Sequence, residues 1–170
     1  MRSLSKNEAL AELERHKQQL LRQPGDCVMC ALAARRDPEL LVLEHNAGSV
    51  VLDRFGNRAG HLLVVGSRHV QRATELSWAE YSELQRLTYD ACHALERALK
   101  PKRVYTAALG SSLELPMTYA HFHLHVVPLL EEGEGTRPAE VFSWSHGVVS
   151  YDESEARSLV SELRRAWPRL

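Results

Sequence analysis

The sequence predicts an α+β protein in which a five-stranded antiparallel meander sheet packs against one long helix. The first observation is the order of the elements: three strand-like runs, one long amphipathic segment and two further strand-like runs. The second is a run that alternates histidine with apolar residues, since a period of two is typical of a strand with one buried face. Further helical segments are predicted at both ends of the chain.

Composition narrows the class of protein. The 170 residues, of which 44% are apolar, can form one domain with a real core. A net charge of -1 gives no indication of a nucleic-acid surface, and no 18-residue apolar run predicts a membrane helix. The polar N-terminal stretch differs from a secretory signal, and three cysteines do not make a disulfide framework. We therefore expect a cytoplasmic protein without nucleic-acid or membrane partners.

Three capping boxes indicate where helices begin. In each, a Ser or Asp side chain and a Glu three residues later satisfy one another's backbone amides. The pairs are Ser5 with Glu8, Ser77 with Glu80, and Asp152 with Glu155. The helices they open are predicted to end near residues 23, 99 and 167, and the middle one is the long helix of the prediction.

The predicted strands are short apolar runs bounded by turn residues. They cover residues 40–43, 50–53, 61–65, 104–109 and 122–127, with a further short strand at 148–151. A loop with two glycines occupies residues 54–60, and an acidic loop occupies residues 131–138. The segment 141–145 holds two aromatic residues, and its default interpretation is the edge of the core.

The most informative run is the strand that carries three histidines. Because successive side chains of a strand point to opposite faces, His121, His123 and His125 share one face. At a rise of ~3.3 Å per residue, neighbouring imidazoles lie roughly 6.5 Å apart, close enough to address one phosphate or one metal. A row of core histidines would need a row of buried partners, so this face indicates a functional site.

Other residues are ambiguous when each is considered alone. The pair Cys27-x-x-Cys30 is compatible with a metal site, a redox motif or chance. His61 opens a predicted strand, and His69 alone would be an ordinary loop histidine. The remaining histidines are interpreted as ordinary residues, and Cys92 as a small core residue within the long helix.

Taken together, these residues resemble the histidine-triad (HIT) family. The run His121-x-His123-x-His125-Val-Val matches the family's alternating pattern, and the resemblance covers roughly residues 27–129. Upstream, Asp53, His61 and His69 are similar to the family's aspartate strand, the following histidine strand and a later basic-histidine-aliphatic run. The resemblance implies a HIT-like fold, with residues 27–130 as the HIT domain, 1–26 as an N-terminal helical extension and 131–170 as a packed C-terminal loop and helix.

The resemblance also implies nucleotidyl chemistry. The middle histidine, His123, would attack the α-phosphate of a nucleotide and form a covalent intermediate that water or another acceptor resolves. His125 and His61 would donate to phosphate oxygens or to the leaving group. Asp53 would accept hydrogen bonds from ribose hydroxyls, and Thr118 would face the phosphate. Dinucleoside polyphosphates or nucleoside phosphoramidates are the implied substrates.

The chain departs from the family pattern just before the triad. Relatives usually carry a Gly-Gln-Ser/Thr run there, and the glutamine helps to clamp the phosphate. This sequence has Met117 in that stretch, and a methionine cannot replace a glutamine hydrogen bond. The clamp is therefore expected from Ser111, Ser112, Tyr119 or backbone amides, or else activity is altered.

A structural zinc and a homodimer are further implications of the resemblance. The zinc ligands would be Cys27, Cys30, His69 and His121, and two cysteines with two histidines make a closed tetrahedral site. Family members commonly pair through the long helix and an edge strand. The alternative is a monomer in which the terminal helices cover those surfaces.

Two other functions compete with nucleotidyl transfer. The three triad histidines could instead hold a catalytic zinc that activates water, but the two cysteines and His69 would then be unexplained. The protein could also bind a nucleotide without turning it over, because the usual phosphate loop is missing.

Overall fold

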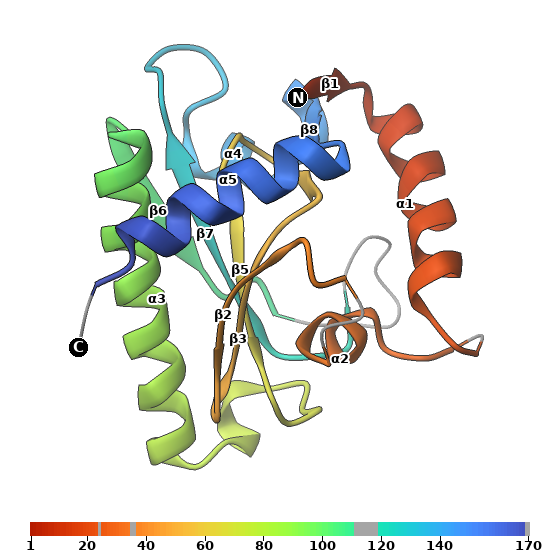
Figure 1. The fold of residues 1–170 in the computed structure, drawn as a ribbon, viewed down its shortest axis with the longest axis vertical. Coiled ribbons are helices and arrows are strands. Elements are labelled where there is room, and N and C mark those ends of the chain that lie inside the picture. Colours follow the sequence, from red (N-terminus) through yellow and green to blue (C-terminus); the bar gives the residue numbers. More distant parts are fainter. Residues whose placement is uncertain (24, 35–36, 111–118, 169–170) are drawn as a thin grey trace.

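A five-stranded antiparallel sheet forms the centre of the computed structural model, which describes residues 1–23, 25–34, 37–110 and 119–168 (Figure 1). The strands are β2 (Leu41–His45), β3 (Gly48–Leu52), β5 (Leu62–Gly66), β6 (Arg103–Ala107) and β7 (His123–Leu129). Their order across the sheet is β2-β3-β5-β7-β6, and every neighbouring pair is antiparallel. The predicted fold class is confirmed.

The strand order departs from a strict meander at one point. The chain leaves β5, passes through α3 (Trp78–Leu99) and returns as β6, and β7 then inserts between β5 and β6. Consequently β5 and β6 run parallel to each other, and parallel strands need a long crossover such as this helix. The insertion makes β7, the histidine strand, an interior strand with a partner on either side.

The main core lies between this sheet and α3. Phe122, Leu124 and Val126, which alternate with the histidines, are buried in the same apolar cluster as Leu87 and Leu95 of α3. The helix α5 (Glu153–Ala166) packs against α3 and β2. The alternation therefore divides β7 as predicted, with Leu124 and Val126 in the core and His123 and His125 on the other face. The strand begins at His123, so His121 lies two residues before it.

Three segments far apart in the sequence form a second sheet. It contains three short antiparallel strands in the order β1 (Arg2–Leu4), β8 (Val148–Ser150) and β4 (Phe55–Gly56). The sequence predicted β8 from the run Val-Val-Ser-Tyr at 148–151 but predicted neither β1 (Arg-Ser-Leu) nor β4 (Phe-Gly), because these contain no apolar run and are too short for a periodicity. This sheet joins the N-terminal strand and the segment after α4 (Pro138–Val141) to the loop that leads to His61.

The remaining elements are helical. α1 (Lys6–Leu20) follows β1, α2 (Val28–Ala33) packs on the side of the sheet formed by β3 and β5, and α4 (Pro138–Val141) is a single turn. Two 3-10 turns cover Ala73–Glu75 and Trp144–His146. The three predicted capping boxes are all present. The division into segments 1–26, 27–130 and 131–170 stays a prediction.

No helix in the described part of the chain has the length and apolar character that crossing a bilayer requires.

Candidate active site and metal centre

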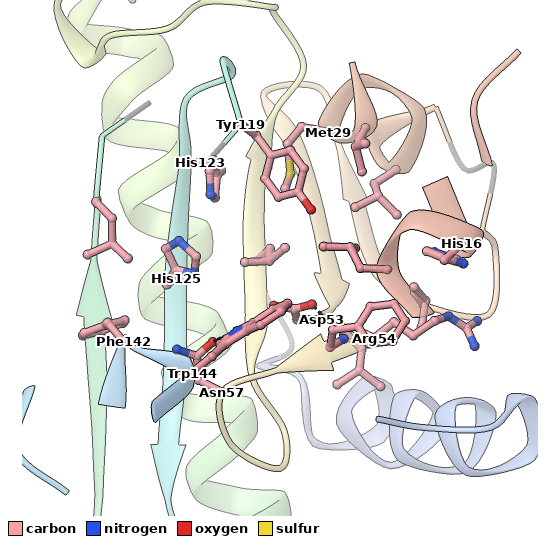
Figure 2. Close-up of a pocket in the computed structure, with 18 of the residues that line it drawn as sticks. His16, Met29, Asp53, Arg54, Asn57, Tyr119, His123, His125, Phe142 and Trp144 are labelled. Atoms are coloured by element: carbon pink, nitrogen blue, oxygen red, sulfur yellow. Dashed lines mark hydrogen bonds between the residues drawn. The ribbon is translucent and has the colours of Figure 1, made fainter. Parts of the chain in front are cut away.

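The imidazole face of β7 borders a cavity of about 360 Å³ (Figure 2). His123 and His125 line one end of it, and His16 and Arg54 line the other. Asp53, at the end of β3, lies between them. The walls come from segments far apart in the sequence, including α1, α2 and the region after α4, and they are largely apolar. A concave, mainly apolar site with a few convergent polar groups is the usual form of a small-molecule site.

His123 is held in one tautomer. Its Nδ1 lies 2.7 Å from the carbonyl oxygen of His121, and a carbonyl can only accept, so Nδ1 carries the hydrogen and donates. The lone pair of the neutral ring is therefore on Nε2. Burial lowers the pKa of His123, which favours this neutral form. A neutral imidazole with a free Nε2 beside a cavity is a competent nucleophile.

His61 and His125 form a chain of hydrogen bonds whose direction is also set by the backbone. The N–H of Asn57 donates to Nδ1 of His61 over 3.1 Å, so in the neutral ring Nε2 of His61 carries the hydrogen. That Nε2 lies 3.0 Å from Nδ1 of His125 and donates to it. His125 therefore holds its own hydrogen on Nε2 and is a hydrogen-bond donor.

Burial governs the charge of these rings. It lowers the pKa of His61 to about 3 and that of His125 well below the ordinary value, with neighbouring histidines adding to the effect. Gly60 allows His61 to enter the core, because its φ is +83° and a Cβ there would lie 2.5 Å from Leu99. His61 is therefore neutral and buried, and it holds His125 in place by donating a hydrogen bond to its Nδ1.

Asp53 is the acidic group of the cavity. Its Oδ1 accepts from the backbone N–H of Phe55 at 3.0 Å, and its Oδ2 lies 3.3 Å from Nδ1 of His61. Burial raises the pKa of this carboxyl to about 6, against the opposing effect of the Phe55 hydrogen bond. Near neutral pH it is thus mainly an ionised acceptor. Thr118, the other predicted substrate-binding residue, lies outside the described residues, as do Ser111, Ser112 and Met117.

The four predicted metal ligands come together just before the N-terminal end of β7. The ligand atoms of Cys27, Cys30, His69 and His121 all lie within 4.8 Å of one another. Sγ of Cys30 lies 3.2 Å from Nδ1 of His69 and 3.4 Å from Nδ1 of His121, and Sγ of Cys27 lies 3.6 Å from the latter. Around a tetrahedral zinc, a sulfur and a nitrogen ligand are about 3.6 Å apart, so the cluster can hold a metal ion.

The tautomer of His121 fits a metal as well. Its Nε2 lies 2.9 Å from the carbonyl oxygen of Gly66 and must donate to it, which leaves the lone pair of Nδ1 directed at the two cysteines. A carbonyl behind a histidine ligand is the usual support of zinc sites. Cys27 caps α2, and its sulfur accepts from the N–H of Cys30 at 3.5 Å.

Several residues of the site were missed by sequence reasoning. Asn57 donates from its side chain to the carbonyl of Val141 at 2.8 Å and accepts from the indole of Trp144 at 3.3 Å. Phe142 lies against His125, with ring centroids 6.0 Å apart. These contacts join the loop before His61 to the segment after α4, which therefore lines the cavity. The two aromatic residues of segment 141–145 were the sequence feature that could have indicated a cavity wall. The default interpretation of this segment as the edge of the core did not include that role.

The arrangement of sheet, helix and histidines defines a histidine-triad protein. The chain belongs to this superfamily, since the family model described as "Scavenger mRNA decapping enzyme C-term binding" matches residues 26–138.

Curated and solved relatives agree with this assignment. An uncharacterized HIT-like protein of Mycoplasma genitalium is 28% identical over 114 residues, which are 65% of this chain and 78% of that protein. The fold is similar to a hypothetical histidine triad nucleotide-binding protein from Sulfolobus tokodaii, with a TM-score of 0.65, 18% identity, and 82% and 91% of the two chains covered. It is also similar to a Zn-bound histidine triad family protein from Mycobacterium smegmatis, with a TM-score of 0.57, 20% identity, and 83% and 97% covered.

Proposed function

We propose that this protein is a nucleotide hydrolase or nucleotidyl transferase that acts at an α-phosphate through a covalent intermediate on His123. The observation that carries the proposal is the bond from Nδ1 of His123 to the His121 carbonyl, which leaves Nε2 as a nucleophile at the cavity. Dinucleoside polyphosphates and nucleoside phosphoramidates are the substrate classes. The description of the matching family adds cap-type dinucleotides to the compounds worth assaying.

The chemistry has two displacement steps. In the first, Nε2 of His123 forms a bond to the α-phosphorus while the bond to the leaving oxygen or nitrogen breaks, and the leaving group departs with the electron pair. The His121 carbonyl accepts a hydrogen bond from the ring as it becomes cationic. In the second step water attacks phosphorus, the electron pair returns to Nε2, and the nucleotide and a proton are released.

The neighbouring groups have complementary roles in this scheme. His125 donates from Nε2 to the leaving group or a phosphate oxygen, and His61 holds it in the donor tautomer. Asp53 accepts from the ribose hydroxyls, with the base directed into the apolar part of the cavity formed by residues such as Met29 and Leu52. Thr118 keeps its predicted role as a hydroxyl near the phosphate.

A triad-bound catalytic zinc receives little support from this geometry. Nδ1 of His121 faces the two cysteines, Nδ1 of His123 donates to a carbonyl, and Nδ1 of His125 accepts from His61. Both ring nitrogens of His121 are engaged, Nδ1 by the cysteines and Nε2 by the Gly66 carbonyl, so this ring cannot join His123 and His125 around one ion. The metal instead belongs to the cluster of Cys27, Cys30, His69 and His121, where zinc would tie α2 to the sheet.

The test is a His123→Ala variant assayed on diadenosine polyphosphates, an adenosine phosphoramidate and a cap dinucleotide. We expect turnover to fall a thousandfold or more, because the covalent route is lost. Wild-type protein quenched in base during turnover is expected to show a mass increase of one nucleotidyl group, absent in the variant.

The matched control is His93→Ala, which removes a histidine from α3 away from the cavity. It should keep wild-type turnover. Near-normal turnover in His123→Ala would eliminate the mechanism. Nucleotide binding without turnover by the wild type on all three substrate classes would support the binding-module alternative.

A further inference from the structure

Most polar side chains of the cavity already have partners within the protein. Asn57 uses both ends of its amide, the Trp144 indole donates to that amide, and the Ser143 hydroxyl donates to the carbonyl of Glu140 at 3.0 Å. At the far end, Arg54 pairs with Asp37 at 3.1 Å through its terminal nitrogen, while its buried Nε has no hydrogen-bond partner among the described residues. A polar group can recognise a ligand when it has a donor or acceptor atom that is not used within the protein.

The hydroxyl of Tyr119 stands out against this background. Tyr119 lines the cavity, and within the described part of the chain its hydroxyl has no hydrogen-bond partner. Figure 2 shows that hydroxyl turned into the cavity, on the side of the ring that faces Asp53. Tyr119 is one of the candidates for the phosphate clamp that the sequence suggests, and the two-step scheme proposed above does not use its hydroxyl.

Two contacts hold the Tyr119 ring in place. Its centroid lies 6.3 Å from that of His123 in an edge-on arrangement. From the outer side, the ammonium of Lys17 in α1 lies 5.6 Å from the ring centroid, within the range of a cation-π contact. The hydroxyl is thus carried on a rigid ring beside the nucleophile, although the residue precedes the histidine strand.

We propose that Tyr119 and Asp53 form a two-sided clamp on the ribose of the substrate, so that the site selects ribonucleotides over deoxyribonucleotides. The inference rests on the proposed function, because it places the α-phosphate at His123 and the sugar next to it. The phenol donates to a ribose hydroxyl, and the same or the adjacent hydroxyl donates to the carboxylate of Asp53.

The chemistry of the two groups matches a sugar hydroxyl. A neutral phenol offers one donor, whereas an ionised carboxylate can only accept. A ribose hydroxyl both accepts and donates, so it satisfies both groups together. A deoxy position would leave Tyr119 and Asp53 with an unfilled hydrogen bond inside a largely apolar cavity, which costs binding energy.

The experiment measures binding by calorimetry and therefore needs no turnover. The probes are AMP, GMP, CMP and UMP with their 2′-deoxy and 3′-deoxy counterparts, titrated into wild-type protein and Tyr119→Phe. One lost neutral hydrogen bond should weaken the best-bound ribonucleotide roughly 3- to 10-fold in the variant. The deoxy counterpart that lacks the contacted hydroxyl should bind both proteins equally.

The matched control is Tyr105→Phe on β6, whose hydroxyl donates to the Thr136 carbonyl at 3.3 Å and does not line the cavity. It should bind every probe as the wild type does. A loss in Tyr119→Phe that is equal for ribo and both deoxy forms, or no loss, overturns the clamp. Failure of the wild type to bind any of the nucleotides would overturn the proposed function itself.

Discussion

His121 serves two sites through different atoms. Its ring points Nδ1 at Cys27 and Cys30, and its backbone carbonyl accepts from Nδ1 of His123. A metal held by the ring would therefore restrain the carbonyl that sets the tautomer of His123, the proposed nucleophile. This contact would couple a structural metal to that histidine although the two share no ligand.

The burial of His61 predicts a pH dependence of stability. Its pKa is about 3 in the folded protein against 6.5 as the ordinary value, so below pH 6.5 the unfolded chain binds the extra proton and the folded chain does not. Stability is therefore lost as pH falls from about 6.5 towards 3, with a slope of up to about 1.4 kcal/mol per pH unit for this one group.

His61→Asn should make that slope shallower. Urea unfolding of chelator-treated protein between pH 5 and 7 measures it, and His93→Asn, on the surface of α3, should keep the wild-type slope. An unchanged slope in His61→Asn would show that the acid sensitivity comes from other groups.

At the scale of elements, α2 depends on the metal cluster. The helix has only six residues, too few to be stable alone, and both cysteines lie at its start. A closed Cys2His2 site couples metal binding to folding, so the ion would fasten this helix to the strand that ends at Gly66 and to β7.

Cys30→Ser should accordingly lose zinc and stability. We expect about one zinc per wild-type chain and almost none in the variant, measured by elemental analysis. With free zinc a thousandfold above its Kd, losing the site costs about 4 kcal/mol, which is roughly 10 °C in Tm.

The control for this substitution is Cys92→Ser, a half-buried cysteine of α3 outside the cluster, which should retain zinc. Zinc that persists in Cys27→Ser/Cys30→Ser and disappears only on changing His123 or His125 would place the metal at the triad instead.

At the scale of the whole molecule, the two edges of the main sheet differ. The β2 edge is covered by α5, where the guanidinium of Arg164 donates to the carbonyl of Leu41 at 2.6 Å. β6 has β7 as its one sheet neighbour within the described chain, and the α3 side chain of Tyr89 is 64% exposed. An open edge strand and an exposed aromatic are features that partners cover.

We therefore retain the homodimer as a prediction and place it at β6 and α3. Light scattering should give about twice the chain mass of 19.2 kDa at micromolar concentration. Tyr89→Glu should shift the mass towards the monomer, because it places a charge on this exposed position of α3. A mass near that of one chain for the wild type would mean that the terminal helices already provide the needed cover.

The sequence by itself determined the features that depend on neighbours along the chain. The capping boxes, the strand runs and the alternation of β7 are local, and the structure confirms each of them. The meeting of Cys27, Cys30, His69 and His121 was available only through the family resemblance, because no local rule brings residues so far apart together.

Tertiary structure alone decided the rest of the site. The sequence offered Tyr119 only as a candidate for the phosphate clamp, and its contact with Lys17 of α1 was not predictable. Asn57 meets Trp144 because β4 and β8 pair in one small sheet. The insertion of β7 between β5 and β6 follows from the crossover through α3. Each of these features depends on contacts between segments that are distant in the sequence. Such contacts are stabilised by the burial of apolar surface from both segments, and they produce no periodic pattern in the sequence.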